Sequence, residues 1–293
     1  MTSETTSSPP AAFRAAGDLR LLKWPALDAS GVDAAVTAHS GGVSSGPYES
    51  LNLSLSVGDD PGCVLANRRR LATAFGAAPG DFVFAHQVHG AGVRVVTASD
   101  RGRGAFSLDD AIGSATGAGP AGGADVLVTT SPGVVLAVLT ADCVPIVLHD
   151  PVAGVLACVH AGWRGTAAGV TAAAVAALQD LGTRPSDVIA GIGPAIGADR
   201  YQVGPDVHEA VSRSFGPAAP GFIRPDPSVP GRWLLDLPSA NRHALRATGV
   251  PGPHIHATDL VTGPASGHFF SDRTARPCGR LALVARLRPG GER

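Results

Sequence analysis

The chain has 293 residues, of which 44% are hydrophobic and 16% are charged, and its formal net charge is -1. A chain of this length and hydrophobicity can bury a sizeable core, as one large domain or two small ones. The near-zero charge excludes a strongly basic surface, so we expect neither nucleic acid nor an anionic membrane as a partner. Pro132, Asp142 and Pro145 interrupt the most apolar region, which argues against a membrane span.

The start of the chain and its cysteine content indicate a cytoplasmic protein. The first residues lack the basic segment followed by an apolar one that marks a secretory signal. Four cysteines in a chain of this length do not make a disulfide framework, so each is a packing residue, a metal ligand or a nucleophile. Lys23 is the only lysine, which disfavours Schiff-base chemistry and leaves arginine to bind phosphate or carboxylate groups.

In chain order, residues 1–18 are rich in Ser, Thr, Pro and Ala and are expected to form a disordered tail. Residues 33–55 predict a strand, a Gly/Ser turn and an alternating stretch, and 66–76 predict a short helix that ends at Gly76. Two strands are expected around the Gly90 turn. The Gly/Ala-rich stretch 101–123 has no periodicity, and we interpret it as a mobile surface loop or lid.

Four short apolar runs follow, and their spacing favours a strand meander over helices: ADVLVTT, GVVLAVL, VPIVLHD and GVLACVH. A helix is expected over 165–181, because its apolar residues recur on one face and Gly182 ends the pattern. Further on, the sequence predicts a strand at 186–197, helices at 206–215 and 239–249 separated by a Pro-rich loop, and a last strand at 280–288. Strands and helices do not alternate strictly, so we expect an α+β fold with mixed β-sheets, forming a single domain over 19–293.

The hairpin formed by VPIVLHD and GVLACVH brings two reactive residues together. Asp150, Pro151 and Gly154 make a turn centred near residue 152, which places Cys143 opposite or nearly opposite His160, and facing residues have Cβ atoms roughly 5 Å apart. That distance suits two ligands of one zinc ion or a thiol beside its general base. The competing structural interpretation is a small core cysteine and a hydrogen-bonded histidine at a strand end.

FAHQVHGAG offers a third ligand in His86 or His89, which point to opposite faces of an extended strand. The spacing alone does not choose between them. Cys158 shares a face with His160 and is a further ligand candidate, although we expect it to be a buried packing residue. HAGWRGT places Arg164 at a helix N-terminus, which is either an anion site or a helix capped by Thr166.

Together these motifs resemble the YfiH family, which carries the older label of polyphenol oxidase or laccase-domain protein. The resemblance is colinear over roughly residues 35–285 and rests on GGVSSGPYESLNLSLSVGDD, HQVHG, ADVLVTT, ADCVPIVLHDP, HAGWRGT and LDLPSANR. It implies an α+β fold similar to that of proposed cysteine hydrolases. It also implies that zinc is bound by His89, Cys143 and His160, which selects His89 over His86.

The resemblance further implies a purine nucleoside phosphorylase that acts on adenosine, inosine and methylthioadenosine, with adenosine deaminase activity. In that mechanism zinc activates water toward C6 of adenine, or acts with Arg164 to orient phosphate against C1′ of the ribose. Asp142 is a candidate proton carrier or ligand-orienting residue, and its competing role is to cap a turn. Ser44, Asn52 and Arg68 lie in the motif stretches and are substrate- or phosphate-binding candidates without individual roles.

Four residues depart from the family pattern, and they bear on substrate preference and anion contacts. Arg200 replaces a frequent cysteine, Asp272 a frequent tyrosine, Thr274 a common arginine and His39 another common arginine.

Three other functions are open. The first is a copper-dependent polyphenol oxidase, although the chain has one H-x-H pair, His254 and His256, where a three-copper cluster needs several. Copper can also replace zinc in the same site. The second is a hydrolase, such as an amidase that edits cell-wall precursors, with Cys143 as the nucleophile. The third is a metal-loaded regulatory or interaction protein, in which Arg68, Arg69 and Arg70 would form a contact surface.

Overall fold

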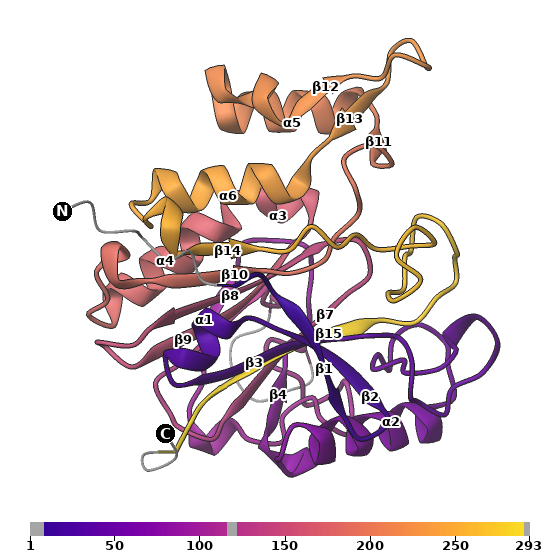
Figure 1. Cartoon of the computed structure of the whole chain (residues 1–293), viewed down its shortest axis with the longest axis vertical. Helices are drawn as coiled ribbons and strands as arrows, with labels where there is room; N and C mark the ends of the chain where they lie inside the picture. The colour runs from indigo at the N-terminus through magenta and orange to yellow at the C-terminus, as the bar shows by residue number, and fades with distance from the viewer. Residues whose placement is uncertain (1–8, 116–121, 290–293) are drawn as a thin grey trace.

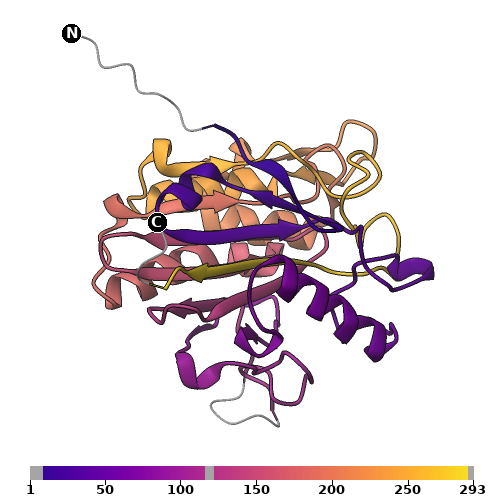
Figure 2. The same cartoon turned by 60° about the horizontal axis from the view of Figure 1, so that its bottom comes forward.

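Two six-stranded mixed β-sheets pack face to face between layers of helices in the computed structural model, which describes residues 9–115 and 122–289 (Figure 1). Helix α2 (Pro61–Ala74) covers the outer face of one sheet. Helices α3 (Trp163–Ala167), α4 (Val170–Asp180) and α6 (Leu237–Ala247) cover the outer face of the other. Figures 1 and 2 show α2 and α6 on opposite sides of the paired sheets. The predicted α+β class with mixed sheets is confirmed.

The first sheet carries the chain's last strand in its middle, in the order β1-β2-β3-β15-β7-β4. Its strands are β1 (Ala12–Ala16), β2 (Leu19–Lys23), β3 (Val32–Thr37), β15 (Leu281–Leu287), β7 (Val135–Thr140) and β4 (Phe82–Phe84). The predicted last strand is therefore confirmed. The expectation of a disordered tail to residue 18 is wrong for β1, which pairs antiparallel with β2. The aromatic ring of Phe13 explains the difference, because it stacks on Phe269 and Arg20 lies over it. Residues 1–8 of that expected tail lie outside the described residues.

The second sheet contains the hairpin formed by VPIVLHD and GVLACVH, and its strand order is β14-β10-β8-β9-β6-β5. Its strands are β14 (Ile255–Ala257), β10 (Ile189–Ile192), β8 (Val144–Asp150), β9 (Val155–Ala161), β6 (Val126–Thr129) and β5 (Val93–Val95). All seven residues of β8 and of β9 are buried, because this sheet is covered on both faces. The four apolar runs are β6 to β9 as predicted, but the expected meander is wrong because β7 belongs to the first sheet. Continuous apolar runs lack the alternation that would indicate which sheet a strand joins.

The helices are α1 (Pro25–Ala29), α2 (Pro61–Ala74), α3 (Trp163–Ala167), α4 (Val170–Asp180), α5 (Pro205–Phe215) and α6 (Leu237–Ala247). The single helix expected over 165–181 is wrong, because Gly169 adopts a left-handed φ of 81° and separates α3 from α4. The predicted buried face of α4 holds, since Val170, Ala174 and Leu178 are fully buried. No helix within residues 9–115 and 122–289 is long and apolar enough to cross a membrane.

A third, small sheet lies at the α5 end of the molecule in Figure 1, with β11 (Gln202–Val203), β13 (Trp233–Leu235) and β12 (Ile223–Pro225). Two of its strands lie in or beside the segment expected to be a Pro-rich loop. That residues 19–293 fold as a single domain stays a prediction.

The described part of the stretch 101–123 is packed, where a mobile loop was expected. Ile112 exchanges backbone hydrogen bonds with the segment Phe84–His86, and Ala105, Ala111 and Ile112 are buried. Residues 116–121 of that stretch lie outside the described residues.

Candidate functional site

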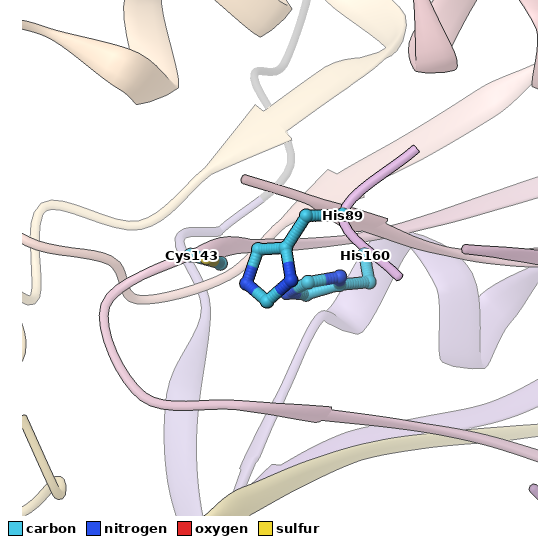
Figure 3. Close-up of side chains that lie close together, drawn as sticks. All are labelled: His89, Cys143 and His160. Carbon is cyan, nitrogen blue, oxygen red and sulfur yellow. The ribbon is translucent and has the colours of Figure 1, made fainter. Parts of the chain in front are cut away.

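His89, Cys143 and His160 converge at the end of the β8–β9 hairpin, and we call them the metal cluster (Figure 3). Each residue offers one ligand atom, and these atoms lie within 4.8 Å of one another. The two imidazole rings meet edge to face with centroids 4.8 Å apart. In the described part of the chain this is the only group of three or more His, Cys, Asp or Glu side chains placed to hold a metal ion.

The strand register differs by two residues from a direct pairing of Cys143 with His160. His160 lies opposite Pro145, and Val144 lies opposite Ala161, so Cys143 is a diagonal neighbour of His160, in agreement with the expectation that the two residues face each other or nearly so. A shift of two residues keeps every side chain on its expected face, because the strand period is two. Diagonal neighbours remain within reach of each other across two strands, so the expected meeting of Cys143 and His160 occurs through this diagonal contact.

Gly162 leaves the space that the metal cluster needs. A Cβ atom added at this position would lie 3.0 Å from Cys143 Sγ and 2.9 Å from His89 Cδ2. Contacts that short require the thiol and the imidazole to move, so a residue without a side chain is the one that fits.

Asp125 ties two of the three cluster residues together, and sequence reasoning missed it. Its buried carboxylate accepts hydrogen bonds from His160 Nδ1 at 2.8 Å, from the His89 amide at 3.0 Å and from the Gly90 amide at 2.7 Å. The bond to Nδ1 leaves His160 Nε2 as the available ligand atom. The signal for this role was present in ADVLVTT, where a single charged residue precedes a fully buried strand.

Two residues at the site adopt backbone conformations that are rare outside glycine. His89 has φ 59° and Asp142 has φ 90°, and such positions cost about 1–3 kcal/mol each. Asp125 holds the first through the His89 and Gly90 amides. The Asp142 carboxylate accepts hydrogen bonds from the Thr262 hydroxyl and the Arg273 amide, which hold the second.

Electrostatics favour a thiolate at position 143. Burial raises the pKa of the Cys143 thiol, but His160 and His89 outweigh burial and bring that pKa well below its usual value. Burial lowers the pKa of His160, while the Cys143 thiolate and Asp125 together raise it above its usual value. One thiolate–imidazolium interaction thus accounts for a large part of both shifts.

The donor set fits a zinc ion. Zinc in proteins is bound by thiolate sulfur and imidazole nitrogen, and catalytic sites use three protein ligands with one position left open. The cluster supplies one sulfur and two imidazoles beside an open cavity, and Asp125 orients one imidazole as carboxylates commonly do at zinc. Copper binds the same donor types more tightly, so these residues suit either ion.

The metal cluster opens into a cavity of about 800 Å³, a size typical of small-molecule sites. Two of the predicted substrate residues, Arg164 and Asp142, line it. Four arginines face this space, namely Arg164, Arg273, Arg276 and Arg280. Trp163 and Tyr201 add aromatic surface.

Arg164 is exposed, and its guanidinium lies over the Trp163 ring at 4.3 Å from the centroid. Helix α3 has only five residues and carries little dipole, so an anion at this position would be held by the guanidinium and not by the helix N-terminus, and the anion site itself stays a prediction. Arg164 therefore faces the cavity as an individual cation. Asp142, by contrast, lines the cavity with both carboxylate oxygens already accepting hydrogen bonds, which matches the turn-holding role.

Ser44 and Asn52 do not line the cavity. Both bind the carboxylate of Asp59, at 2.6 Å from Ser44 Oγ and 2.9 Å from Asn52 Nδ2. The Asn52 side-chain oxygen also accepts from the amides of Ser54 and Arg280, two residues that do line the cavity. Their expected contact with substrate is therefore replaced by a role in holding the wall.

Arg68 is also placed away from the cavity, contrary to the expectation. Its buried guanidinium donates to the carbonyls of Leu53, Gly104 and Ala105 and lies over the Phe84 ring. Burial lowers its pKa to about 10. Arg68 thus fastens the start of the 101–115 segment to the chain before α2.

The remaining candidates from the sequence are Cys158, His86 and the four departures from the family pattern. Cys158 is fully buried, with a thiol whose pKa burial raises, which agrees with packing. His86 lines the cavity outside the metal cluster. Of the four departures from the family pattern, only Asp272 lines the cavity; His39, Arg200 and Thr274 do not.

The chain matches the family model described as multi-copper polyphenol oxidoreductase laccase over residues 33–288. It is 41% identical over 271 residues to the purine nucleoside phosphorylase YlmD of Geobacillus stearothermophilus, covering 90% of this chain and 94% of that one. It is also 42% identical over 243 residues to the purine nucleoside phosphorylase SCO2081 of Streptomyces coelicolor, covering 83% and 90%.

Solved structures agree with these relationships. The crystal structure of YlmD from Geobacillus stearothermophilus superposes with a TM-score of 0.86 at 38% identity, covering 96% of this chain and all of that one. The Bacillus licheniformis protein YfiH gives a TM-score of 0.86 at 33% identity, covering 94% and 99%. The chain therefore belongs to the YfiH family, whose model is described as a laccase and whose curated relatives are named purine nucleoside phosphorylases.

Proposed function

We propose that this protein is a zinc-dependent purine nucleoside phosphorylase that acts on adenosine, inosine and methylthioadenosine, and that it also deaminates adenosine. The observation that carries the proposal is the opening of a three-ligand metal cluster into a cavity lined by four arginines. A metal site beside concentrated positive charge suits a reaction in which phosphate attacks a neutral sugar carbon. The names of the relatives support the same reaction.

His89, Cys143 and His160 would hold the ion, with His160 oriented by Asp125. When bound, zinc supplies a Lewis acid that polarises an oxygen of phosphate or water. Holding the ion this way requires a deprotonated thiol, which the histidines around Cys143 already favour.

In phosphorolysis a phosphate oxygen forms a bond to C1′ while the C1′–N9 bond breaks and the purine leaves with the electron pair. Arg164 would hold the phosphate with its guanidinium, and the faces of Trp163 and Tyr201 would stack on the purine. The positive charge of the arginines keeps phosphate bound next to the sugar, which converts the attack into a step within one complex.

A second candidate is a hydrolase, such as an amidase, with Cys143 as the nucleophile. One arrangement favours it: Asp125, His160 and Cys143 are connected in the order that activates a thiol in cysteine hydrolases. A polyphenol oxidase has less support despite the family description, because the described residues hold one metal cluster and such oxidases need several. A reduced thiol at position 143 fits the cytoplasm, where we propose that the protein works.

Metal analysis of the purified protein, followed by incubation with adenosine and phosphate, tests the proposal. We expect about one zinc per chain at this three-ligand site, and the formation of adenine, hypoxanthine or inosine. His89→Ala and Cys143→Ala should abolish both metal and products. Cys63→Ala is the matched control, because Cys63 is a free thiol on α2 outside the cavity. Full turnover in the first two variants would reject the site.

The hydrolase candidate makes a different prediction for the same assay. Cys143→Ser would replace the sulfur nucleophile with an oxygen nucleophile and would remove the thiolate ligand of the metal. If the protein is a hydrolase, the activity of the unsubstituted protein toward amides would survive metal chelation. Loss of all activity on chelation, with recovery on adding zinc, favours the phosphorylase.

A further inference from the structure

The wall of the cavity between β14 and β15 holds an unusual charge arrangement, which we call the arginine wall: Asp272, Arg273, Arg276 and Arg280. It lies on the long loop that reaches the right side of Figure 1 before the chain enters β15. The Asp272 carboxylate binds two guanidiniums at once, with one oxygen on Arg280 Nη2 at 2.8 Å and the other on Arg276 Nη2. A carboxylate bridging two arginines occupies the kind of position that a phosphate group takes between such side chains.

The two arginines differ in how firmly they are held. Arg280 has a side chain only 26% exposed, and it also donates to the carbonyls of Cys278 and Gly279. Its backbone amide is fixed by Asn52. Arg276 is 77% exposed, and among the described residues Asp272 is its only hydrogen-bond acceptor. A guanidinium has five N–H donors, so Arg276 keeps donors available toward the cavity.

We propose that Arg276 and Arg280 form an anion subsite of the cavity for a phosphate group, and that Asp272 is its resident internal anion, which sets the affinity for that group. The incoming phosphate binds the free donors of both arginines while the Asp272 charge repels it. Asp272 is thus a specificity-determining residue, and Arg280 is the fixed half of the subsite. The inference rests on the proposed function in assigning phosphate as a reactant.

The phosphate group has two possible sources, inorganic phosphate or the phosphoryl group of a nucleotide. Both present the same oxyanion to the arginines, so binding measurements with inorganic phosphate and with adenosine monophosphate separate them. The substitutions that alter the subsite should change the binding of whichever source it serves.

The test uses zinc-loaded full-length protein and measures binding by calorimetry, with the KM for phosphate measured in parallel. Asp272→Asn removes the repelling charge at nearly constant volume, and should tighten binding by about fivefold at contact distances in water. Arg276→Gln removes a charge-assisted hydrogen bond and should weaken binding by about tenfold. The KM for the nucleoside should stay within about twofold in both variants, because a subsite for phosphate does not contact the base.

The chain offers a matched control in Glu209 and Arg213 on α5, which form an ion pair with the same spacing of four residues. The Arg213 side chain is 75% exposed, a fraction similar to the 77% of Arg276. Neither Glu209 nor Arg213 lines the cavity. Glu209→Gln and Arg213→Gln change the net charge of the protein by the same amounts as the two subsite variants. Both should leave anion binding unchanged, which would show that net charge alone does not explain the effects at the subsite.

The outcomes separate the subsite from the proposed function. If the two subsite variants shift phosphate binding in opposite directions and no nucleoside is consumed by any protein, the subsite stands and the phosphorylase proposal fails. If phosphorolysis proceeds and neither variant changes the binding of phosphate or of adenosine monophosphate, the subsite is overturned and the phosphorylase proposal stands. A change with adenosine monophosphate alone assigns the subsite to a nucleotide phosphoryl group.

Discussion

The metal cluster and the arginine wall face the same cavity but are built in different ways. In the metal cluster, His160 lies on the buried strand β9, whereas Cys143 directly precedes β8 and His89 lies on an exposed loop. The fully buried Asp125 fixes the two histidines through hydrogen bonds to the His160 ring and the His89 amide. The arginine wall sits on a loop and is fixed mainly by ion pairs that solvent reaches. A reaction centre needs donor atoms held within fractions of an ångström, whereas charges that attract an anion act over longer distances. We infer that the first region determines the chemistry and the second adjusts what enters.

The sharpest way to break this comparison is to remove the metal. Chelation should abolish phosphorolysis and deamination, and added zinc should restore them, because the cluster has no other group that could act as a Lewis acid. We expect the rate of phosphorolysis to fall by more than about a hundredfold, because mutation of residues that only hydrogen-bond to metal ligands already lowers activity by up to that factor. Retention of nucleoside turnover after complete removal of zinc would show that the cluster is structural.

Asp125→Asn tests whether the buried carboxylate positions the cluster. The amide keeps the shape but presents one oxygen acceptor, so either His160 or the 88–90 segment loses its partner. We expect zinc affinity and activity to fall about 10- to 100-fold, measured by competition with a chromophoric chelator. Asp59→Asn is the control for zinc affinity, because Asp59 lies in a polar network outside the cavity and away from the three ligands. Unchanged zinc affinity in the Asp125 variant would mean that the backbone places the ligands without the help of this carboxylate.

Gly162→Ala tests the space beside the metal cluster. The new methyl group would press on Cys143 and His89, so zinc affinity should fall about tenfold and stability should fall by about 1–3 kcal/mol. Gly80→Ala is the matched control, because a Cβ there meets nothing within 4 Å. Zinc titration and thermal unfolding check the two effects, and equal behaviour of the two variants would contradict the packing argument.

The smallest expected effect is on folding stability, and it concerns the ion pairs of the arginine wall at low pH. Burial raises the pKa of Asp272, but Arg276 and Arg280 outweigh burial and hold that pKa below its usual 3.8. Because the folded-state pKa lies below the unfolded one, the ion pairs stabilise the protein above pH 3.8 and this contribution is lost as the pH falls through the folded-state pKa.

Asp272→Asn should therefore lower stability at neutral pH by at most about 1 kcal/mol, since Arg276 is largely exposed. The difference from the unsubstituted protein should disappear in strong acid. Urea unfolding across pH measures it, and a difference that persists unchanged at low pH would show that the carboxylate acts through something other than its charge.

The metal cluster could be anticipated from the sequence because hairpin geometry restricts which residues meet. The turn at Asp150 and Gly154 brings Cys143 and His160 to one face of the sheet. The observed register differs by two residues from a direct pairing of the two, and a shift of two residues preserves that face. The choice of His89 over His86 came from the family resemblance, since spacing alone allowed either residue.

The rest depended on contacts that are distant in the sequence. The carboxylate of Asp125 lies 35 residues from His160, and Asn52 binds the Arg280 amide across 228 residues. The single charge before β6 marks Asp125 as unusual, but no local pattern identifies its partner or reveals the contact of Asn52. Arg68 and Ser44 were assigned to substrate because polar residues in shared motifs suggest binding, yet both are buried and hold loops. The assignment of β7 to the other sheet likewise follows from its pairing with β15, which lies near the end of the chain, far from β7 in the sequence.

X-ray absorption at the zinc edge of the purified protein tests the central claim most directly. The metal cluster predicts one sulfur at about 2.3 Å and imidazole nitrogens at about 2.0–2.1 Å, with the sulfur lost in Cys143→Ala. A zinc spectrum without a sulfur scatterer in the unsubstituted protein, or one unchanged by that substitution, would contradict the account.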